Sequence, residues 1–190
     1  CAPDARPLCA LCRGGLSPSS DPPDGVTAPY DHGGPLMRAV HRAKYGDDPG
    51  LARALGALLV PHVSAWRGEI DAVIPVPLHR ARLRSRGFNQ SYELARPVAR
   101  ALDARLWPDA VERVRDTGTQ TARSREARHD NVRGAFSVRR VAALRGARVL
   151  LVDDVVTTGA TLFALRDAAL DAGAREARGL TLTRMAKWLA

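Results

Sequence analysis

The stretch VLLVDDVVTTGATL, residues 149–162, decides the fold. Its apolar first part is rich in β-branched residues and predicts a strand buried inside a parallel sheet. Asp153 and Asp154 are expected in a loop at the carboxyl end of this strand, and Gly159 to Thr161 are expected to begin a helix. The free N–H groups and the positive dipole end of a helix start favour a phosphate, and carboxylates accept hydrogen bonds from sugar hydroxyls. This stretch therefore predicts a site for a phosphorylated sugar.

The same stretch resembles the phosphoribosyl-pyrophosphate (PRPP) signature of type I phosphoribosyltransferases. The resemblance implies that Asp153 and Asp154 hold the ribose hydroxyls at the catalytic centre. It also implies that the following loop holds the 5-phosphate of PRPP, through Thr157, Thr158, Gly159, Ala160 and Thr161.

Strand-like and helical patterns alternate along the rest of the chain, which predicts an α/β fold with a mostly parallel sheet flanked by helices. The resemblance specifies the type I phosphoribosyltransferase fold with a small N-terminal cysteine knuckle. Strands are expected at residues 70–76, 111–115, 134–138, 148–152 and 177–183. Helices are expected at residues 35–45, 51–63 and 161–172, and around an apolar stripe of Leu94, Val98 and Leu102.

An arginine-rich turn, HRARLRSRGFNQ at residues 79–90, follows the strand predicted at 70–76. Because α/β proteins bind ligands at the carboxyl ends of strands, and arginine forks match phosphate oxygens, this turn predicts a pyrophosphate site. The candidate residues are Arg82, Arg84 and Arg86. The alternative is a solvated charged face.

The sequence PVPL at residues 75–78, the arginines and RGFNQ at residues 86–90 together resemble the ComF family of competence-associated, phosphoribosyltransferase-like proteins, which has GntX-like relatives. The resemblance implies binding of PRPP with Mg²⁺ and transfer of the phosphoribosyl group to an unidentified acceptor, such as a nucleobase, with release of pyrophosphate. The alternative function is a non-catalytic accessory factor in DNA uptake, with single-stranded DNA or the competence machinery as partner. Whether the chain is an enzyme stays open at this point, and a homodimer is a further expectation.

A long polar and basic segment, residues 116–131, separates two predicted strands, and such a segment is typical of a mobile lid. Lids of this kind exclude water from a reaction site when they close. The family pattern of a Gln followed by Arg-x-x-Asn is matched by Gln120, Arg128 and Asn131. The alternative is a surface insertion with solvated arginines.

The cysteines Cys1, Cys9 and Cys12 have the spacing C-x7-C-x2-C, which looks like part of a structural Zn²⁺ site. The fourth zinc ligand is expected to be a residue upstream of Cys1, His32 or a water molecule. The alternative to zinc binding is that the cysteines are a redox pair or free thiols. Residues 1–16 are therefore predicted to form a partial zinc-finger-like knuckle. Residues 17–29, rich in Pro, Ser, Asp and Gly, are predicted to be a linker, and residues 30–190 the phosphoribosyltransferase-like domain.

The net charge of +9 suits an anionic ligand or nucleic acid. Lys44, one of two lysines, ends the helix predicted at 35–45 and is either a solvated helix end or a cation that faces the substrate. Aromatic residues make up only 5% of the chain, so no stacking platform for bases is evident. Without a recognisable secretion signal or an apolar run of about 18 residues, we expect a cytoplasmic protein without a membrane span.

Overall fold

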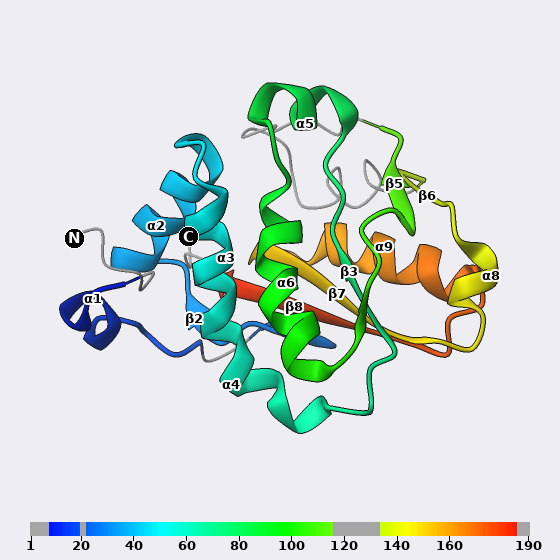
Figure 1. Cartoon of the computed structure of the whole chain (residues 1–190), viewed down its shortest axis with the longest axis horizontal. Coiled ribbons are helices and arrows are strands. Elements are labelled where there is room, and N and C mark those ends of the chain that lie inside the picture. The colour runs from blue at the N-terminus through cyan, green and yellow to red at the C-terminus, as the bar shows by residue number, and fades with distance from the viewer. Residues whose placement is uncertain (1–7, 20–21, 116–133, 186–190) are drawn as a thin grey trace.

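A parallel sheet forms the centre of the computed structural model, which describes residues 8–19, 22–115 and 134–185 (Figure 1). Its strands lie side by side in the order β1 (Val26–Thr27), β8 (Glu176–Arg184), β7 (Arg148–Val156), β3 (Ala72–Pro75) and β4 (Arg105–Leu106), and β2 (Tyr30–Asp31) also pairs with β8. Every pairing in this sheet is parallel. The mostly parallel sheet predicted from the sequence is therefore confirmed.

Helices cover both faces of the sheet. One face carries α2 (Gly34–Tyr45), α3 (Pro49–Gly56), α4 (Val60–Val63) and α6 (Gln90–Leu102), and the other carries α8 (Val141–Leu144) and α9 (Ala160–Asp171). The apolar run of β7 supplies both layers, because Leu150 and Val152 belong to the cluster under α2, α3 and α6, whereas Val149 and Leu151 pack with α9. Burial on both faces is why residues 149–152 of this strand are all apolar and do not alternate with polar residues.

The predicted arginine-rich turn forms a short helix, α5 (Arg80–Arg86), between β3 and α6. His79 caps its first turn, and Gly87 ends it with a φ of 78°, a left-handed conformation that favours glycine. The helix after it, α6, is preceded by Asn89, whose side chain accepts a hydrogen bond from the Ser91 N–H. A side chain in this position caps the helix start and fixes where α6 begins.

Two further predictions need correction. The strand β7 extends to Val156, so Asp153 and Asp154 lie within it and not in a loop, because β8 continues to pair with it as far as Arg184. The helix predicted at residues 51–63 is divided into α3, a 3₁₀ turn at Ala57–Leu59 and α4. A second 3₁₀ turn follows at Ser64–Trp66.

The segment predicted as a linker contributes to the sheet. Val26 and Ala28 are buried, and β1 adds an edge strand next to β8. Two-residue strands carry too little periodicity to be recognised in a Pro- and Gly-rich sequence. The helix α1 (Ala10–Gly14) precedes this segment and follows Cys9.

The strands β5 (Val111–Arg113) and β6 (Phe136–Val138) form an antiparallel pair that is separate from the central sheet. The lid candidates Gln120, Arg128 and Asn131 lie outside the described residues.

The connections between the strands reverse direction at one point of the sheet. From β3 the chain passes through α6 to β4 on one side, and from β7 it passes through α9 to β8 on the other. Because α6 and α9 lie on opposite faces, the carboxyl ends of β3 and β7 form a switch point, where open α/β sheets bind their ligands. In the parts of the chain that the structure describes, none of the helices has the length and apolar character needed to cross a membrane.

Candidate functional site

The acid pair at the carboxyl end of β7 is the centre of the site. The Ser91 hydroxyl of α6 donates a hydrogen bond of 2.8 Å to Asp153 Oδ1, and the Asp154 N–H donates to the same oxygen at 2.9 Å. Lys44 Nζ lies 2.8 Å from Asp154 Oδ2, and the Asp154 side chain is only 8% exposed. Both carboxylates are thus held by helices of one layer, although they are neighbours in a strand.

Burial and proximity set the charges of this group. Burial, together with the negative charge of Asp154, raises the pKa of Asp153 to about 6, even though the Ser91 hydrogen bond opposes the change. Burial alone would lower the pKa of Lys44, but the Asp154 carboxylate outweighs it and the pKa lies above its ordinary value. Lys44 is therefore a permanent cation beside the acid pair at neutral pH. Because Lys44 is mostly buried and paired with Asp154, the prediction that it is a solvated helix end is wrong.

His32 and Thr183 belong to the same neighbourhood and were not predicted to do so. His32 follows β2, and its Nδ1 lies 2.9 Å from Thr183 Oγ1 on β8. The Thr183 hydroxyl in turn donates to the Asp154 carbonyl at 3.4 Å. His32 was one of three options for a fourth zinc ligand, and within the described ranges it does not belong to a group of three or more metal-ligating side chains. No local sequence signal connects His32 to the acid pair, since β2 and β8 bring them together.

The loop between β7 and α9 has the predicted form of a helix start. Gly159 precedes α9 with a φ of 81°, and a Cβ placed there would lie 2.6 Å from the Phe163 ring. Both facts require glycine at this position. The Thr158 hydroxyl accepts a weak hydrogen bond of 3.4 Å from the Ala160 N–H, and Thr157 is exposed. The first turn of α9, which includes Thr161, presents N–H groups without partners inside the helix, as a phosphate site requires.

The three arginine candidates on α5 differ in their positions. Arg86 Nη1 donates to Gln90 Oε1 at 2.6 Å, and its guanidinium lies 5.3 Å from the centre of the Tyr45 ring, which places it beside the helix that carries Lys44. Arg82 is four residues earlier, hence on the same side of the helix, and is half-buried, whereas Arg84 is exposed. The geometry therefore favours Arg86 and Arg82 over Arg84 as ligands for an anion at the switch point.

Helix α5 is also connected to the antiparallel pair β5 and β6. Arg80 Nη2 lies 3.4 Å from Glu112 Oε2 on β5, and Arg139 pairs with the same carboxylate. The hydrogen bond from Arg139 lowers the pKa of Glu112, so this carboxylate stays ionised at neutral pH. The exposed pairs contribute little stability individually, and their effect is to set the position of the arginine helix.

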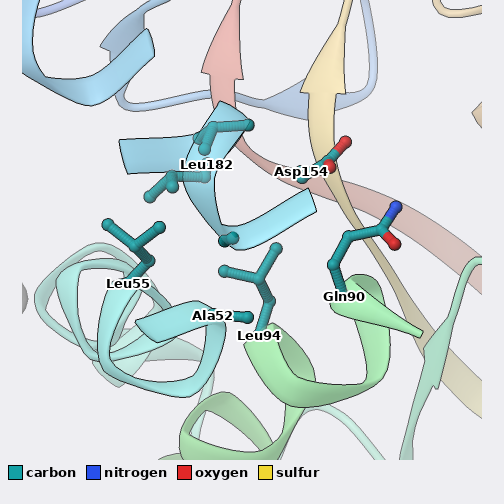
Figure 2. A pocket seen from close by; sticks show the side chains of 8 residues that line it. Ala52, Leu55, Gln90, Leu94, Asp154 and Leu182 are labelled. Atoms are coloured by element: carbon teal, nitrogen blue, oxygen red, sulfur yellow. The ribbon is translucent and has the colours of Figure 1, made fainter. Parts of the chain in front are cut away.

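A small pocket lies next to Asp154. Figure 2 shows Asp154 and Gln90 at one side of it, while Leu55, Leu94 and Leu182 line the rest. Its volume of about 10 Å³ has room for one water molecule at most. A sugar phosphate cannot enter it, so this pocket is not the predicted site for a phosphorylated sugar.

The two described cysteines lie close together at α1. A hydrogen bond between the thiols of Cys9 and Cys12 raises the pKa of Cys12, which is the effect expected of two thiols that compete for one proton. Cys1 lies outside the described residues. The structure therefore brings together two of the three predicted zinc ligands.

The fold and the site define a class of protein: a doubly wound α/β protein with carboxylates and a glycine-containing helix start at its switch point. A family model described as "Phosphoribosyl transferase domain" matches residues 89–188. The chain belongs to this family, and its fold is the type I phosphoribosyltransferase fold that the sequence predicted.

Curated relatives place the chain within this family. "DNA utilization protein YhgH" of Escherichia coli O6:H1 is 36% identical over 149 residues, which cover 76% of this chain and 65% of that protein. "Competence protein F" of Haemophilus influenzae is 37% identical over 137 residues, covering 67% of this chain and 58% of that protein. The chain thus spans less than two thirds of the length of these relatives. The predicted resemblance to the ComF group is confirmed.

A solved structure of the glutamine PRPP amidotransferase from B. subtilis, complexed with ADP and GMP, is similar in outline. Its sequence is 24% identical, the TM-score is 0.47, and the similarity covers 68% of this chain and 25% of that one.

Proposed function

We propose that this chain binds PRPP together with Mg²⁺ and transfers the phosphoribosyl group to an acceptor, with release of pyrophosphate. The observation that supports this proposal is the meeting of three elements at one edge of the sheet: the acid pair of β7, the start of α9, and the arginines of α5 after β3. A phosphate, a ribose and a pyrophosphate are the three parts of PRPP, and each element has the chemistry for one of them.

The reaction is a displacement at the anomeric carbon, where positive charge develops on the sugar as pyrophosphate leaves. The roles of the protein are to orient the groups and to stabilise this charge. Asp153 and Asp154 would hold the ribose hydroxyls beside the developing cation. The N–H groups at the start of α9 would hold the 5-phosphate, and Arg82 and Arg86 would bind the pyrophosphate.

The donor set fits Mg²⁺ that is bound mainly through ligand oxygens and water. Asp153 and Asp154 already have partners in Ser91 and Lys44, so few carboxylate oxygens are available as direct metal ligands. Mg²⁺ commonly retains several waters and binds through one or two carboxylates plus phosphates. When bound, the ion would neutralise charge on the pyrophosphate.

Calorimetry with PRPP and Mg²⁺ tests the proposal. We expect the protein to bind, and the double variant Asp153→Asn, Asp154→Asn to lose binding while remaining folded. Asp71→Asn is a matched control, because Asp71 precedes β3 at the opposite, amino end of the sheet. Equal affinity in the double variant would refute the ribose assignment, and loss of affinity in the control would show that the effect is not local.

A second candidate function is the handling of single-stranded DNA without catalysis. It is favoured by the names of the relatives, which refer to DNA utilization and to competence, and by the net charge of +9. Titration of an oligonucleotide at several salt concentrations tests it, because binding through phosphates weakens steeply with salt. Salt-dependent binding without any heat from PRPP would support this function against transfer.

Zinc binding by Cys1, Cys9 and Cys12 is proposed on the proximity of the two described thiols. Metal analysis of the purified protein is the test, and a folded protein free of zinc would contradict it. The lid role of Gln120, Arg128 and Asn131, a nucleobase as acceptor, a homodimer and a cytoplasmic location also stay predictions.

A further inference from the structure

His32 occupies the flank of the acid pair opposite the arginine helix. The helix α5 follows β3, His32 follows β2, and β7 lies between β3 and β8 in the sheet. The parallel pairing of β2 with β8 and of β8 with β7 brings Asp31, Arg184 and Val156 to one level at the carboxyl edge. His32, one residue further along, therefore stands at the same edge as the acid pair.

The hydrogen bonds of Thr183 determine which nitrogen of His32 is available. We assign the single proton of Thr183 Oγ1 to the Asp154 carbonyl, which lies 3.4 Å away. The contact of 2.9 Å with His32 Nδ1 can form at the same time only if Nδ1–H donates to Oγ1. In the neutral ring, Nε2 then carries the lone pair. The backbone N–H of His32, which donates to the Arg184 carbonyl at 2.6 Å, fixes the residue further.

We propose that His32 is the general base of the reaction and that its Nε2 accepts the proton of the acceptor. This inference rests on the proposed function. Displacement at a carbon places the nucleophile opposite the leaving group, and the arginines hold the leaving pyrophosphate on the β3 side. The acceptor then enters from the β2 and β8 side, where His32 lies.

The step balances without a further reactant. The lone pair of an acceptor N–H or O–H group forms a bond to the anomeric carbon, and the bond from that carbon to the pyrophosphate oxygen breaks. Pyrophosphate leaves with the electron pair, and the proton of the acceptor passes to Nε2. The Thr183 hydroxyl and the Asp154 carbonyl orient the ring, as a partner of the second nitrogen does in other histidine bases.

Burial and the Lys44 cation favour the neutral form of His32. The charged groups around it are Lys44 on α2, Asp154 on β7, Asp31 on β2 and Arg184 on β8, with Arg184 Nη1 lying 3.8 Å from Asp31 Oδ1. Burial and then the Lys44 cation lower the pKa of His32, and the Asp154 carboxylate opposes them. A base needs its free lone pair at working pH, so the lowered value supports the geometric argument.

The first test separates this inference from the proposed function. PRPP and Mg²⁺ binding are measured by calorimetry for the wild type, for His32→Gln and for His62→Gln, a control whose ring contacts Tyr30 instead. We expect all three proteins to bind PRPP with affinities within about threefold. A wild type that does not bind PRPP refutes the proposed function. Loss of binding only in His32→Gln would show that His32 holds PRPP and would overturn the assignment as a base.

The second test measures pyrophosphate release between pH 5 and 8, with water and a panel of nucleobases as acceptors. We expect His32→Gln to reduce the rate on the order of 100-fold, because general bases typically contribute 10²–10⁴-fold. The acidic limb that comes from protonation of Asp153, whose pKa is about 6, should persist in this variant. His62→Gln should leave the rate and the pH profile unchanged. A rate within about threefold of wild type, or PRPP binding without any pyrophosphate release by the wild type, would overturn the assignment.

The third test does not depend on turnover. In ¹⁵N-labelled protein at pH 7.5, long-range ¹H–¹⁵N correlations distinguish the two ring nitrogens of His32. We expect a protonated Nδ1 and an unprotonated Nε2, and mixing of the two forms in Thr183→Val. A protonated Nε2 in the wild type would contradict the inference even if PRPP binds.

Discussion

Asp153→Asn is expected to stabilise the protein at neutral pH while removing PRPP binding. The reason is that the Asp153 carboxylate is buried and lies beside Asp154, and both effects raise its pKa from 3.8 to about 6. An asparagine keeps the oxygen that accepts from the Ser91 hydroxyl and the Asp154 N–H but carries no charge. The substitution therefore removes an unfavourable buried charge and retains the hydrogen bonds.

The magnitude and sign follow from proton linkage. A carboxyl whose pKa is raised by folding contributes stability that is complete below the unfolded value of 3.8 and is lost as the pH rises through about 6. At about 1.36 kcal/mol per pH unit, this difference corresponds to about 3 kcal/mol. The free energy of unfolding of Asp153→Asn should thus exceed that of the wild type by up to about 3 kcal/mol at pH 7.5, and the two should converge near pH 4.

Urea denaturation at intervals between pH 4 and 7.5 measures this difference. Asp71→Asn is a control of opposite sign, since hydrogen bonds from the Arg148 side chain and backbone lower the pKa of Asp71 to about 2. That variant should be less stable than the wild type at pH 7.5, and the deficit should shrink as the pH falls toward 2. A stability difference for Asp153→Asn that is constant between pH 4 and 6, or a destabilised variant at pH 7.5, would refute the reasoning.

Three other substitutions test the remaining parts of the site. Lys44→Met should lower the free energy of unfolding by about 3 kcal/mol at pH 7.5, because it leaves Asp154 buried without a counter-ion; adding Asp154→Asn should restore most of it, and urea denaturation checks both. Gly159→Ala should cost about 1–2 kcal/mol in the same assay, since its φ of 81° is unfavourable for other residues, and should weaken PRPP binding. Arg86→Met should weaken PRPP binding about tenfold in calorimetry, whereas Arg84→Met should change it less than twofold; equal effects would contradict the assignment to one side of α5.

The sequence was sufficient for three strands of the sheet, β3, β7 and β8, and for the contiguous part of the site. The apolar run of β7, the acid pair and the glycine before α9 follow one another in the chain, so local rules apply to them. The arginine-rich segment was placed correctly at the carboxyl end of β3, although not as a helix. Arginine at every second position gives no helical periodicity, and only the cap at His79 and the glycine at the end mark the element.

The residues that surround the acid pair could not be predicted, since they come from distant parts of the chain. Ser91, His32 and Thr183 are ordinary polar residues in sequence, and only the packing of α6, β2 and β8 against β7 brings them to the site. The extension of β7 through the acid pair has the same origin. Aspartate is unfavourable in strands, but backbone pairing with β8 outweighs this preference.

The acid pair also contacts residues that lie outside the part of the chain that the family model matches. The family model begins at residue 89 and therefore includes Ser91 but neither Lys44 nor His32. In a protein limited to the matched residues, Asp154 would keep its place in β7 and lose its counter-ion, and a buried charge without a partner is strongly destabilising. The acid pair at this position therefore depends on α2 and on the segment before it, which makes the N-terminal part of the chain a component of the site.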